Sequence, residues 1–510
     1  MDTSGTSLET KRMTRKVIHN FGKNVSFTPT RLAKPKNEHE LLVLLSQHRG
    51  ESIRVIASGH AWSDAIVTEG LLISVEHLNH VRISDDHQSV SVGAGCQVKQ
   101  LVHQLKPSGL TLPSLGLIDE QTVAGATATS THGSGKHSLS HYVRKVRVAH
   151  YDSQTDEPVI TEIDSGTDLR AARCSLGLLG VIVELELETR PTYQVQEHSQ
   201  HHASLESMLA AEKKFPLQQF YLMPWSWHLF GQHRVETQQL RSKLAGIYGI
   251  YWHWGIDWGL HLIVFLLVRI LRIKAAVRAF FRFILPLTIA RKWYVTDDSH
   301  ALLTMEHELF RHIEIELFVP RSHLKPALEH VRETITVFGG QQPADQKSDN
   351  DSATVIPDQH HGVYCHHYPI CVRRVLADDT LISMTGPSEK NEPSQTTPQE
   401  NFANEAVSEP RNNETSNEDD WYAISFISYE RPDRRAGFFT FAKFLASSMR
   451  IRFGARCHWG KHNPLDLAAN EQLYPQLATF RQIVQRFDPH SRFSNAWLRD
   501  VLLSIPSRSS

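Results

Sequence analysis

The sequence contains few cysteines and no excess of either charge. Its 510 residues include five cysteines, and the 54 Lys and Arg residues nearly balance the 55 Asp and Glu residues. An odd, scattered set of cysteines excludes a disulfide framework, so we expect reduced thiols. The charge balance excludes a global field that would attract nucleic acid, and partners must be sought at individual sites.

The sequence also lacks a long uninterrupted hydrophobic run. The most apolar stretch, Leu260 to Leu271, contains His261 and Arg269 and is shorter than the ~20 residues needed to cross a bilayer. The opening stretch, Met1 to Arg15, is polar and has no apolar core. These features argue against a simple transmembrane span and against a cleaved secretory signal.

The remaining composition is that of a globular protein. With 40% hydrophobic and 21% charged residues, the chain can bury a sizeable core, in two or three domains. Hydrophobic periodicity predicts helices at 38–47 and 97–105 and strands at 53–57, 89–94 and 181–188. In the last strand Val and Leu alternate with Glu, so the aliphatic side chains should face a core and the glutamates water.

A stretch at 244–292 combines apolar residues with regularly spaced cations. Lys274, Arg278 and Arg282 recur every four residues on one helical face, as in a basic helix at a membrane interface. The alternative is a buried helix pair that covers a substrate domain. Three tryptophans slightly favour the membrane, because their rings prefer the headgroup zone: Trp252, Trp254 and Trp258.

Two polar runs interrupt the second half of the chain. The segment 387–420 is rich in Ser, Glu, Asn and Pro and nearly free of large apolar side chains, and a smaller polar segment lies at 341–359. This composition predicts a disordered insertion at 387–420 and a loop at 341–359.

Two glycine-rich segments dominate the first half. Ser58 to Asp64 follows a predicted strand, and Thr122 to Gly135 consists largely of small residues and hydroxyls. Such segments let the backbone approach a bulky or phosphorylated ligand, but they also form tight structural turns. A P-loop is disfavoured because His137 and Ser130 stand at required motif positions, and neither segment matches the dinucleotide pattern G-x-G-x-x-G.

Together, in this order and spacing, the segments resemble the FAD-binding domain of the vanillyl-alcohol oxidase superfamily, also called the PCMH-type domain. Cys457-His458-Trp459-Gly460-Lys461 and the later segment 487–495 resemble motifs of the sugar-1,4-lactone oxidases, the L-gulonolactone and D-arabinonolactone oxidases. The resemblance implies an α+β fold with a PCMH-type FAD-binding domain at 27–193 and an N-terminal tail at 1–26. A substrate or cap domain with a mainly antiparallel sheet flanked by helices would occupy 194–505.

The resemblance also implies the cofactor. FAD would bind covalently through His60, and Gly116 would leave the path of oxygen to the flavin open, which favours an oxidase over a dehydrogenase. The residues expected to hold FAD are Ser58, Gly59, His60, Ser63, Asp64, Ser114, Gly116, Thr122, Val123, Gly125, Thr129, His132, Gly133 and Val181.

For catalysis, the resemblance points to Arg373, Lys461 and His458, the two cations stabilising the reduced, anionic flavin. Cys371 stands where the family has a glutamate that pairs with the arginine, which would leave Arg373 without its counter-ion. His366, His367 or Glu316 could compensate. We otherwise expect Glu314 and Glu316 to lie on a solvated strand edge, with a substrate-pocket role as the alternative.

The family reading gives a hypothesis of function. The protein would oxidise an aldono-1,4-lactone of the L-gulono or D-arabinono type, passing hydride from C2 to flavin N5, while O2 becomes H2O2 and an ascorbate-type product forms. The alternatives are an alditol or other carbohydrate oxidase and a non-catalytic, membrane-associated flavin-binding protein. No metal is expected, because the histidines and cysteines at 360–371 lack ligand spacing. Through 244–292 the protein would associate with a membrane, such as the endoplasmic reticulum, or else be cytoplasmic.

Overall fold

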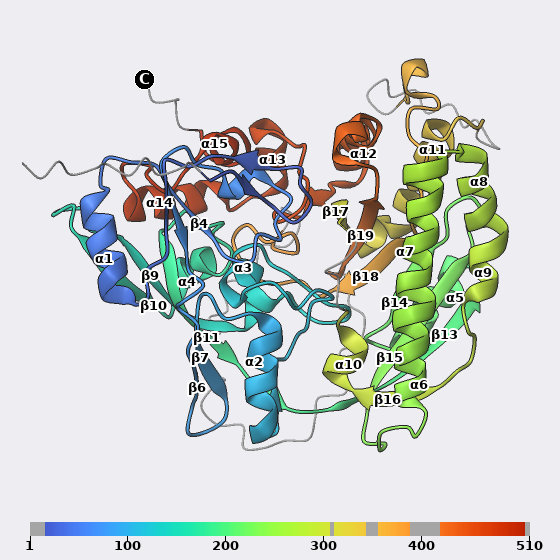
Figure 1. The fold of residues 1–510 in the computed structure, drawn as a ribbon, viewed down its shortest axis with the longest axis horizontal. Coiled ribbons are helices and arrows are strands. Elements are labelled where there is room, and N and C mark those ends of the chain that lie inside the picture. Colours follow the sequence, from blue (N-terminus) through green and yellow to red (C-terminus); the bar gives the residue numbers. More distant parts are fainter. Residues whose placement is uncertain (1–15, 306–310, 343–354, 388–418, 505–510) are drawn as a thin grey trace, which may run out of the picture.

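A computed structural model describes residues 16–305, 311–342, 355–387 and 419–504, which form two halves with a cavity between them (Figure 1). Most of the predicted insertion at 387–420 and the centre of the loop at 341–359 lie outside these residues. The described part of the chain is a mixture of helices and sheets, with a large antiparallel sheet in the second half.

The first half contains one antiparallel and one parallel sheet. The antiparallel sheet has the order β10-β9-β11-β7-β6, and the parallel sheet has the order β3-β5-β4. The strands are β3 (Arg31–Ala33), β4 (Ile53–Ile56), β5 (Leu71–Ser74), β6 (Val81–Ile83), β7 (Ser89–Gly93), β9 (Val143–Tyr151), β10 (Pro158–Ile163) and β11 (Val181–Glu188). The helices are α1 (Glu38–Gln47), α2 (Val98–Leu105), α3 (Val123–Ala128) and α4 (Gly166–Ala172). Two short pairs complete this half: β1 (Ile18–His19) with β2 (Ser26–Phe27), and β8 (Leu110–Thr111) with β12 (Arg190–Pro191).

The local predictions for this half are confirmed, with one correction. Helices α1 and α2 and strands β4, β7 and β11 lie where the periodicity indicates. Asn37 caps α1 by accepting a hydrogen bond from the Glu40 amide. In β11, however, Glu184 is buried, because the side chains of three basic residues surround its carboxylate: His80 and Arg82 bind it, and Arg147 Nη1 lies 3.6 Å from it.

The second half is built on an eight-stranded antiparallel sheet with the order β16-β13-β15-β14-β18-β19-β17-β20. Its strands are β13 (Gln194–His202), β14 (Gln219–Leu222), β15 (Leu229–Thr237), β16 (Val295–Asp298), β17 (Ile313–Pro320), β18 (Ile370–Val375), β19 (Trp421–Ser428) and β20 (Arg456–Cys457). Helices α5 (Leu205–Ala210), α10 (Ser299–Leu303), α11 (Leu324–Phe338) and α12 (Ala436–Phe453) accompany it. The expected antiparallel sheet with flanking helices is therefore confirmed.

The hydrophobic stretch forms two consecutive helical rods that stand side by side at one end of the molecule (Figure 1). We call them the helix pair. The first rod, Ala245–Leu271, contains α6 (Ala245–Ile250), a π-helical segment (Tyr251–Trp258) and α7 (Gly259–Val264), and it ends in a second π-helical segment. The second rod runs from α8 (Lys274–Ala279) to α9 (Leu285–Thr288).

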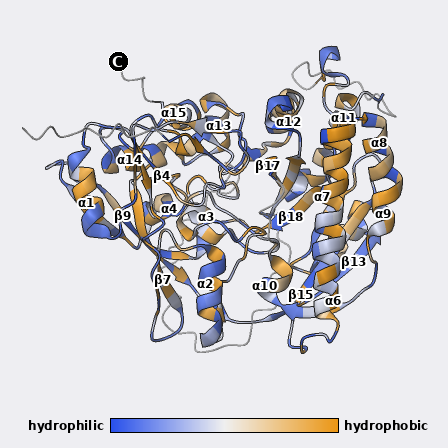
Figure 2. Cartoon of the chain, in the orientation of Figure 1, coloured by the Kyte–Doolittle hydropathy of each residue, from blue (hydrophilic) through white to orange (hydrophobic). Residues whose placement is uncertain are grey.

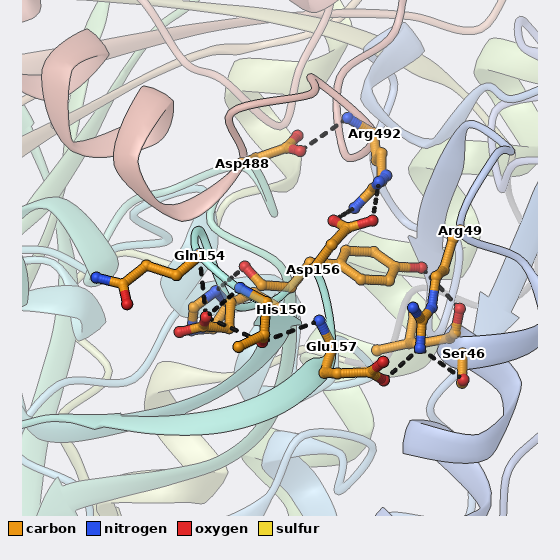
Figure 3. A network of polar contacts seen from close by, with 12 residues as sticks. Ser46, Arg49, His150, Gln154, Asp156, Glu157, Asp488 and Arg492 are labelled. Carbon is orange, nitrogen blue, oxygen red and sulfur yellow. Dashed lines mark hydrogen bonds and ion pairs between the residues drawn. The ribbon is translucent and has the colours of Figure 1, made fainter.

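The C-terminal segment returns to the first half. Helices α13 (Leu467–Leu473), α14 (Leu477–Phe487) and α15 (Ala496–Val501) follow the cap in sequence, but α14 packs against α4. Asp488 accepts the Arg492 amide at 2.8 Å, and the Arg492 guanidinium binds both carboxylate oxygens of Asp156 (Figure 3). Asn495 donates to the main-chain oxygens of Asp64 and Val67. The terminal motif thus ties the end of the chain to the loop after β4.

Candidate active site

The main cavity of the described structure lies between the two halves and has a volume of about 280 Å³. The first half contributes the end of β4, the loop behind it, the segment around α3 and the start of β11. The second half contributes strands β14, β17, β18 and β19, the helix pair and the segment 458–461. Its walls are mostly apolar, with a small group of charged side chains on the strands.

The first glycine-rich segment reaches this cavity at the end of β4. Gly59 has φ +70°, a left-handed conformation that glycine adopts without strain and that turns the chain sharply. The turn brings Ser58, Gly59 and His60 to the cavity wall. The His60 ring stacks on Phe21, with ring centroids 5.1 Å apart, so its orientation is fixed.

The second glycine-rich segment has two separate roles. Thr122 begins α3 and accepts a hydrogen bond from the Gly125 amide, and this part of the segment lines the cavity. Gly135, at its far end, instead donates to the Arg374 carbonyl at 2.7 Å. A Cβ on Gly135 would lie 1.9 Å from the Pro216 oxygen. The end of the segment therefore joins the two halves, which is a structural role.

A third segment with small residues also lines the cavity. The sequence analysis did not identify it and named only the adjacent Val181 as a site residue. Leu176, Gly177 and Gly180 precede β11. Gly180 has φ +136°, and a Cβ there would lie 2.4 Å from the Ala149 oxygen. Arg54 fixes the segment by donating to the Leu176 oxygen at 2.6 Å. The two glycines just before an alternating strand were the signal that could have revealed it.

Ten of the residues expected in the site line this cavity: Ser58, Gly59, His60, Thr122, Gly125, Thr129, His132, Arg373, His458 and Lys461. The other seven do not: Ser63, Asp64, Ser114, Gly116, Val123, Gly133 and Val181. Of these, Ser114 and Gly133 line a small neighbouring cavity. A Cβ on Gly116 would lie 2.7 Å from the Thr131 methyl carbon, and Thr131 itself lines the main cavity.

The charged group of the cavity is centred on Glu316. Its carboxylate accepts from Arg373 at 2.7 Å and from Ser425 at 2.5 Å, and Lys461 Nζ lies 3.1 Å away. Burial alone would raise the pKa of this carboxyl, but Lys461 and Arg373 hold it well below its usual range. The expectation of a solvated edge is wrong, because Glu316 is fully buried and Glu314 nearly so.

Arg373 therefore has a counter-ion despite Cys371. Glu316 supplies the missing carboxylate. It is one of the three residues that the sequence analysis named as able to compensate for the absent glutamate. The other two do not approach the arginine: His366 packs among Tyr364, Phe426 and Phe441, and neither His366 nor His367 lines the cavity. Burial raises the pKa of the Cys371 thiol to about 11, so it enters the cavity as a neutral group.

His458 adds a neutral donor to the same group. Its Nδ1 accepts the Gly460 amide at 3.0 Å. Burial lowers the pKa of the ring well below its usual value, so the neutral form prevails and its proton resides on Nε2. His458 can thus donate a hydrogen bond into the cavity, but it cannot readily accept a proton.

Ligand atoms of His132, Glu316 and His458 lie within 4.8 Å of one another, the spacing of a metal site. Two neighbouring cations oppose a metal ion, because Arg373 and Lys461 already compensate the charges of Glu316 and Glu314 and leave no free carboxylate charge to attract it. The chemistry of these donors therefore favours a hydrogen-bonded ionic group over a metal centre.

The opposite wall of the cavity is apolar and comes largely from the helix pair. Trp252, Ile256 and Leu260 lie about one turn apart on the first rod, and Leu285 and Ile289 come from the second rod and its end. Among these side chains a single carboxylate, Asp257, also lines the cavity. The sequence predicted the rods but not that they form part of the site.

Comparison with known proteins is consistent with this geometry. Residues 29–155 match the family model of an FAD-binding domain, and residues 185–501 match that of D-arabinono-1,4-lactone oxidase. The chain belongs to the FAD-dependent sugar-1,4-lactone oxidase family. Its cofactor is FAD, and the chain is a flavin-dependent oxidoreductase. The small residues of the three glycine-containing segments fit this cofactor, because a flavin nucleotide needs close backbone approach along its length.

Individual relatives are named for different activities. A long-chain alcohol oxidase from an uncultured marine euryarchaeote is 44% identical over 490 residues, covering 95% of this chain and 96% of that protein. L-gulonolactone oxidase from Mus musculus is 23% identical over 490 residues, and the match covers 95% of this chain and 98% of that protein. The solved structure of cholesterol oxidase from Brevibacterium sterolicum has a TM-score of 0.66 at 14% identity, covering 96% and 97%, and supports the fold.

Proposed function

We propose that this family member is an FAD-dependent oxidase that acts on the hydroxyl group of a long-chain primary alcohol. The observation that carries the proposal is the division of its cavity into a charged end on the sheet and an apolar wall on the helix pair. An alcohol with a long hydrocarbon chain matches both parts. The name of the 44% identical relative, a long-chain alcohol oxidase, supports the same choice.

At the charged end, FAD when bound supplies the acceptor of a hydride from the alcohol carbon. Lys461 and Arg373 provide the positive charge that favours negative charge on the reduced cofactor. Glu316 holds both cations in place, and the His458 Nε2 proton is available to hydrogen-bond an oxygen in the cavity. These residues orient the reacting groups and exclude water.

At the apolar end, the helix pair offers side chains suited to a hydrocarbon. Each methylene buried there contributes roughly 0.8 kcal/mol of binding free energy. A sugar lactone carries several hydroxyls, and each would lose hydrogen bonds to water without a polar partner on this wall. The apolar wall therefore supports an alkyl alcohol over a polyhydroxylated substrate.

An aldono-1,4-lactone of the L-gulono or D-arabinono type is the second candidate. The family model for residues 185–501 and the Arg373–Glu316 pair, which restores the charge balance expected in lactone oxidases, favour it. Oxidation at C2 would then give an ascorbate-type product. An alditol oxidase or a non-catalytic flavin protein has less support, because Arg373 retains a carboxylate partner.

Two details of the cofactor chemistry belong to the proposal. FAD is attached covalently through His60, whose ring lines the cavity at the turn after β4. O2 is the final electron acceptor and becomes H2O2, since Gly116 places no side chain beside Thr131 at the cavity wall. Both follow from the family resemblance and are compatible with the positions of these residues.

Membrane association through the helix pair also belongs to the proposal. The first rod is long and apolar enough to cross a membrane by length and composition, and 22% of its most apolar window is buried. One face of this rod lines the cavity, however, so lipid cannot surround it. A position flat on the membrane, with the outer face in the lipid, agrees with the exposed side chains Ile250, Trp254, Leu262, Phe265, Leu266 and Ile270. Figure 2 shows the ribbon around α7 largely in the hydrophobic colour.

Purified protein tests the activity. It should be yellow and produce H2O2 with 1-dodecanol at a kcat/KM at least tenfold above that with L-gulono-1,4-lactone. Peroxide with the lactone but not with any alkyl alcohol would replace the first candidate by the second. Bound flavin that neither class reduces would refute both.

A further inference from the structure

The strand register arranges the cavity-facing side chains of the large sheet in rows that cross its strands. Tyr221 on β14 lies opposite Cys371 on β18. Cys371 in turn lies opposite Ser425 on β19, and Ser425 lies opposite Glu316 on β17. All four residues line the cavity. Since neighbouring strands lie about 4.8 Å apart, this first row is about 14 Å long.

A second row lies two residues further along the same strands, because side chains on one face of a strand recur at every second residue. Its members also line the cavity: Glu314, Ile427, Pro369 and Met223. Met223 directly follows β14, and Leu222, which lies between Tyr221 and Met223, does not line the cavity. Both rows thus have a glutamate at the β17 end and a large uncharged side chain at the β14 end.

The charges of the rows are confined to the β17 end. There the two glutamates bind the Arg373 guanidinium and Lys461 Nζ. At the other end stand Tyr221 and Met223, and in the described structure no charged side chain of β14 or of the second rod lines the cavity. The rows therefore lead from a charged end to an uncharged end.

The Tyr221 hydroxyl is occupied within the sheet. It accepts a hydrogen bond from Gln219 Nε2 at 2.7 Å and donates to Gln232 Oε1 at 3.4 Å. Gln219 also donates to Gln232 at 2.7 Å, so the two amides stay bonded to each other without the tyrosine. Because its polar atom has these partners, Tyr221 offers its aromatic ring to the cavity.

The cavity surface of the sheet ends at β14. The next strand beyond it is β15, and none of the described residues of β15 lines the cavity. Tyr221 and Met223 are therefore the last side chains of the sheet on this side. Leu285 and Ile289 of the second rod and its end, which line the same cavity, add apolar surface to it.

Cys371 stands in the middle of the first row. Burial raises the pKa of its thiol to about 11, so the row carries no charge between Glu316 and Tyr221. A glutamate at this position would place a carboxylate on the row, and a hydrocarbon lying over it would remove the water that the carboxylate needs. With cysteine at position 371, a hydrocarbon can extend from the charged end to Tyr221.

We propose that the alkyl chain of the substrate lies across the strands, between the sheet and the helix pair, and that Tyr221 and Met223 determine which chain lengths are accepted. The hydroxyl group lies at the charged end beside Glu316, and the methyl end reaches β14. Each methylene added along the rows raises kcat/KM roughly three- to fourfold, and methylenes beyond β14 find no further surface. This inference rests on the proposed oxidation of a long-chain alcohol and adds the residues that select it.

The ratio of kcat/KM for 1-hexadecanol to that for 1-decanol tests the inference. Tyr221→Ala opens the end of the rows and should raise this ratio at least fivefold, whereas Met223→Trp fills the end and should lower it at least fivefold. Leu222→Ala is the matched control on the same strand, because Leu222 does not line the cavity, and its ratio should stay within twofold of the wild type. A general loss of stability cannot produce opposite shifts, since it affects both alcohols alike.

Ratios within twofold of the wild type in both variants, or shifts of the same sign, would overturn the inference. A rise of the ratio in Trp252→Ala but not in Tyr221→Ala would also overturn it, because the chain would then lie along the first rod.

Binding of 1-bromoalkanes gives a readout without turnover, because these compounds have no hydroxyl group to oxidise. Quenching of tryptophan fluorescence in the oxidised flavoprotein measures their affinity. The affinity for 1-bromohexadecane relative to 1-bromodecane should rise in Tyr221→Ala and fall in Met223→Trp, and equal relative affinities in all proteins would overturn the inference. A wild type that oxidises no alcohol, in a series that shows these shifts in binding, would overturn only the proposed function.

Discussion

Glu316 supplies the negative charge that the sheet lacks at Cys371, where the family has a glutamate. Both residues lie opposite Ser425 of β19, Glu316 on β17 and Cys371 on β18. The carboxylate that pairs with Arg373 thus comes from two strands away instead of from the arginine's own strand. A single sequence cannot reveal this pairing, because 57 residues separate the partners and only the strand register brings them together.

Restoring a glutamate at position 371 should change substrate choice. Cys371→Glu adds a second carboxylate beside Glu316 and makes the charged end more polar, which disfavours an alkyl chain and offers hydrogen bonds to sugar hydroxyls. The ratio of kcat/KM for L-gulono-1,4-lactone to that for 1-dodecanol should rise about tenfold or more. Cys365→Ser, at a buried cysteine that does not line the cavity, should leave the ratio unchanged. An unchanged ratio in Cys371→Glu would contradict the proposal that the cavity surface around position 371 contacts the substrate.

His60 provides a second prediction at this scale. If it carries the covalent bond to FAD, acid precipitation of the wild type should leave the yellow colour in the pellet, and His60→Ala should release all of it to the supernatant. His312→Ala is a useful control, because His312 also lines the cavity near Phe21 but follows no glycine-rich turn. Release of all flavin from the wild type would refute covalent attachment.

The helix pair covers the cavity, which is one of the two alternatives that the sequence left open, and it also has an exposed outer face. Its inner face is buried against the cavity and its outer face is exposed, whereas hydrophobic periodicity alone could not tell a covering helix from a membrane helix. The basic face was only partly as expected. Arg278 donates to the Gly339 oxygen, and Lys274 to the Gly362 oxygen, so both side chains also anchor the second rod to the protein.

Substitution of the outer face should separate membrane binding from catalysis. Leu262→Glu combined with Leu266→Glu places two charges where lipid is proposed, and should reduce binding to phosphatidylserine-containing vesicles at least tenfold in a sedimentation assay. Flavin content should not change, because both side chains are exposed. Val17→Glu with Val43→Glu, at exposed valines of the first half, is the control. Equal binding by all three proteins would contradict a membrane role for the helix pair.

For the molecule as a whole, the local elements and the FAD-binding motifs were predictable, but the assembly of the cavity was not. Hydrophobic periodicity indicates α1 and α2, and alternation indicates β11, because these patterns depend only on neighbouring residues. The helix pair reaches the cavity, and the last helices return to the first half, through contacts between distant segments. Arg54 illustrates this, since it donates hydrogen bonds to the main-chain oxygens of Leu176 and Phe493, which lie 122 and 439 residues further along the chain.

Buried neutral histidines should make the whole molecule sensitive to acid. Burial lowers the pKa from 6.5 to about 4 for His141, His367 and His462, and to about 3 for His233 and His366. The unfolded chain takes up these protons near pH 6.5 and the folded protein does not, so stability is full above pH 6.5 and falls as the pH drops toward 4. The loss should be on the order of several kcal/mol.

Denaturant unfolding at a series of pH values measures this loss, and His366→Gln should flatten the dependence. A midpoint that stays constant between pH 6.5 and 4.5 would show that these rings are charged in the folded protein.

The dependence of kcat/KM on the length of a primary alcohol tests the central claim most directly. If the apolar wall of the helix pair binds the alkyl chain, kcat/KM should rise roughly three- to fourfold for each added methylene until the wall is covered, as expected from ~0.8 kcal/mol per buried CH2. Ile256→Asp, at the centre of that wall, should abolish the rise while the protein keeps its flavin. A flat profile from ethanol to dodecanol, with rapid flavin reduction by a sugar lactone, would contradict the account.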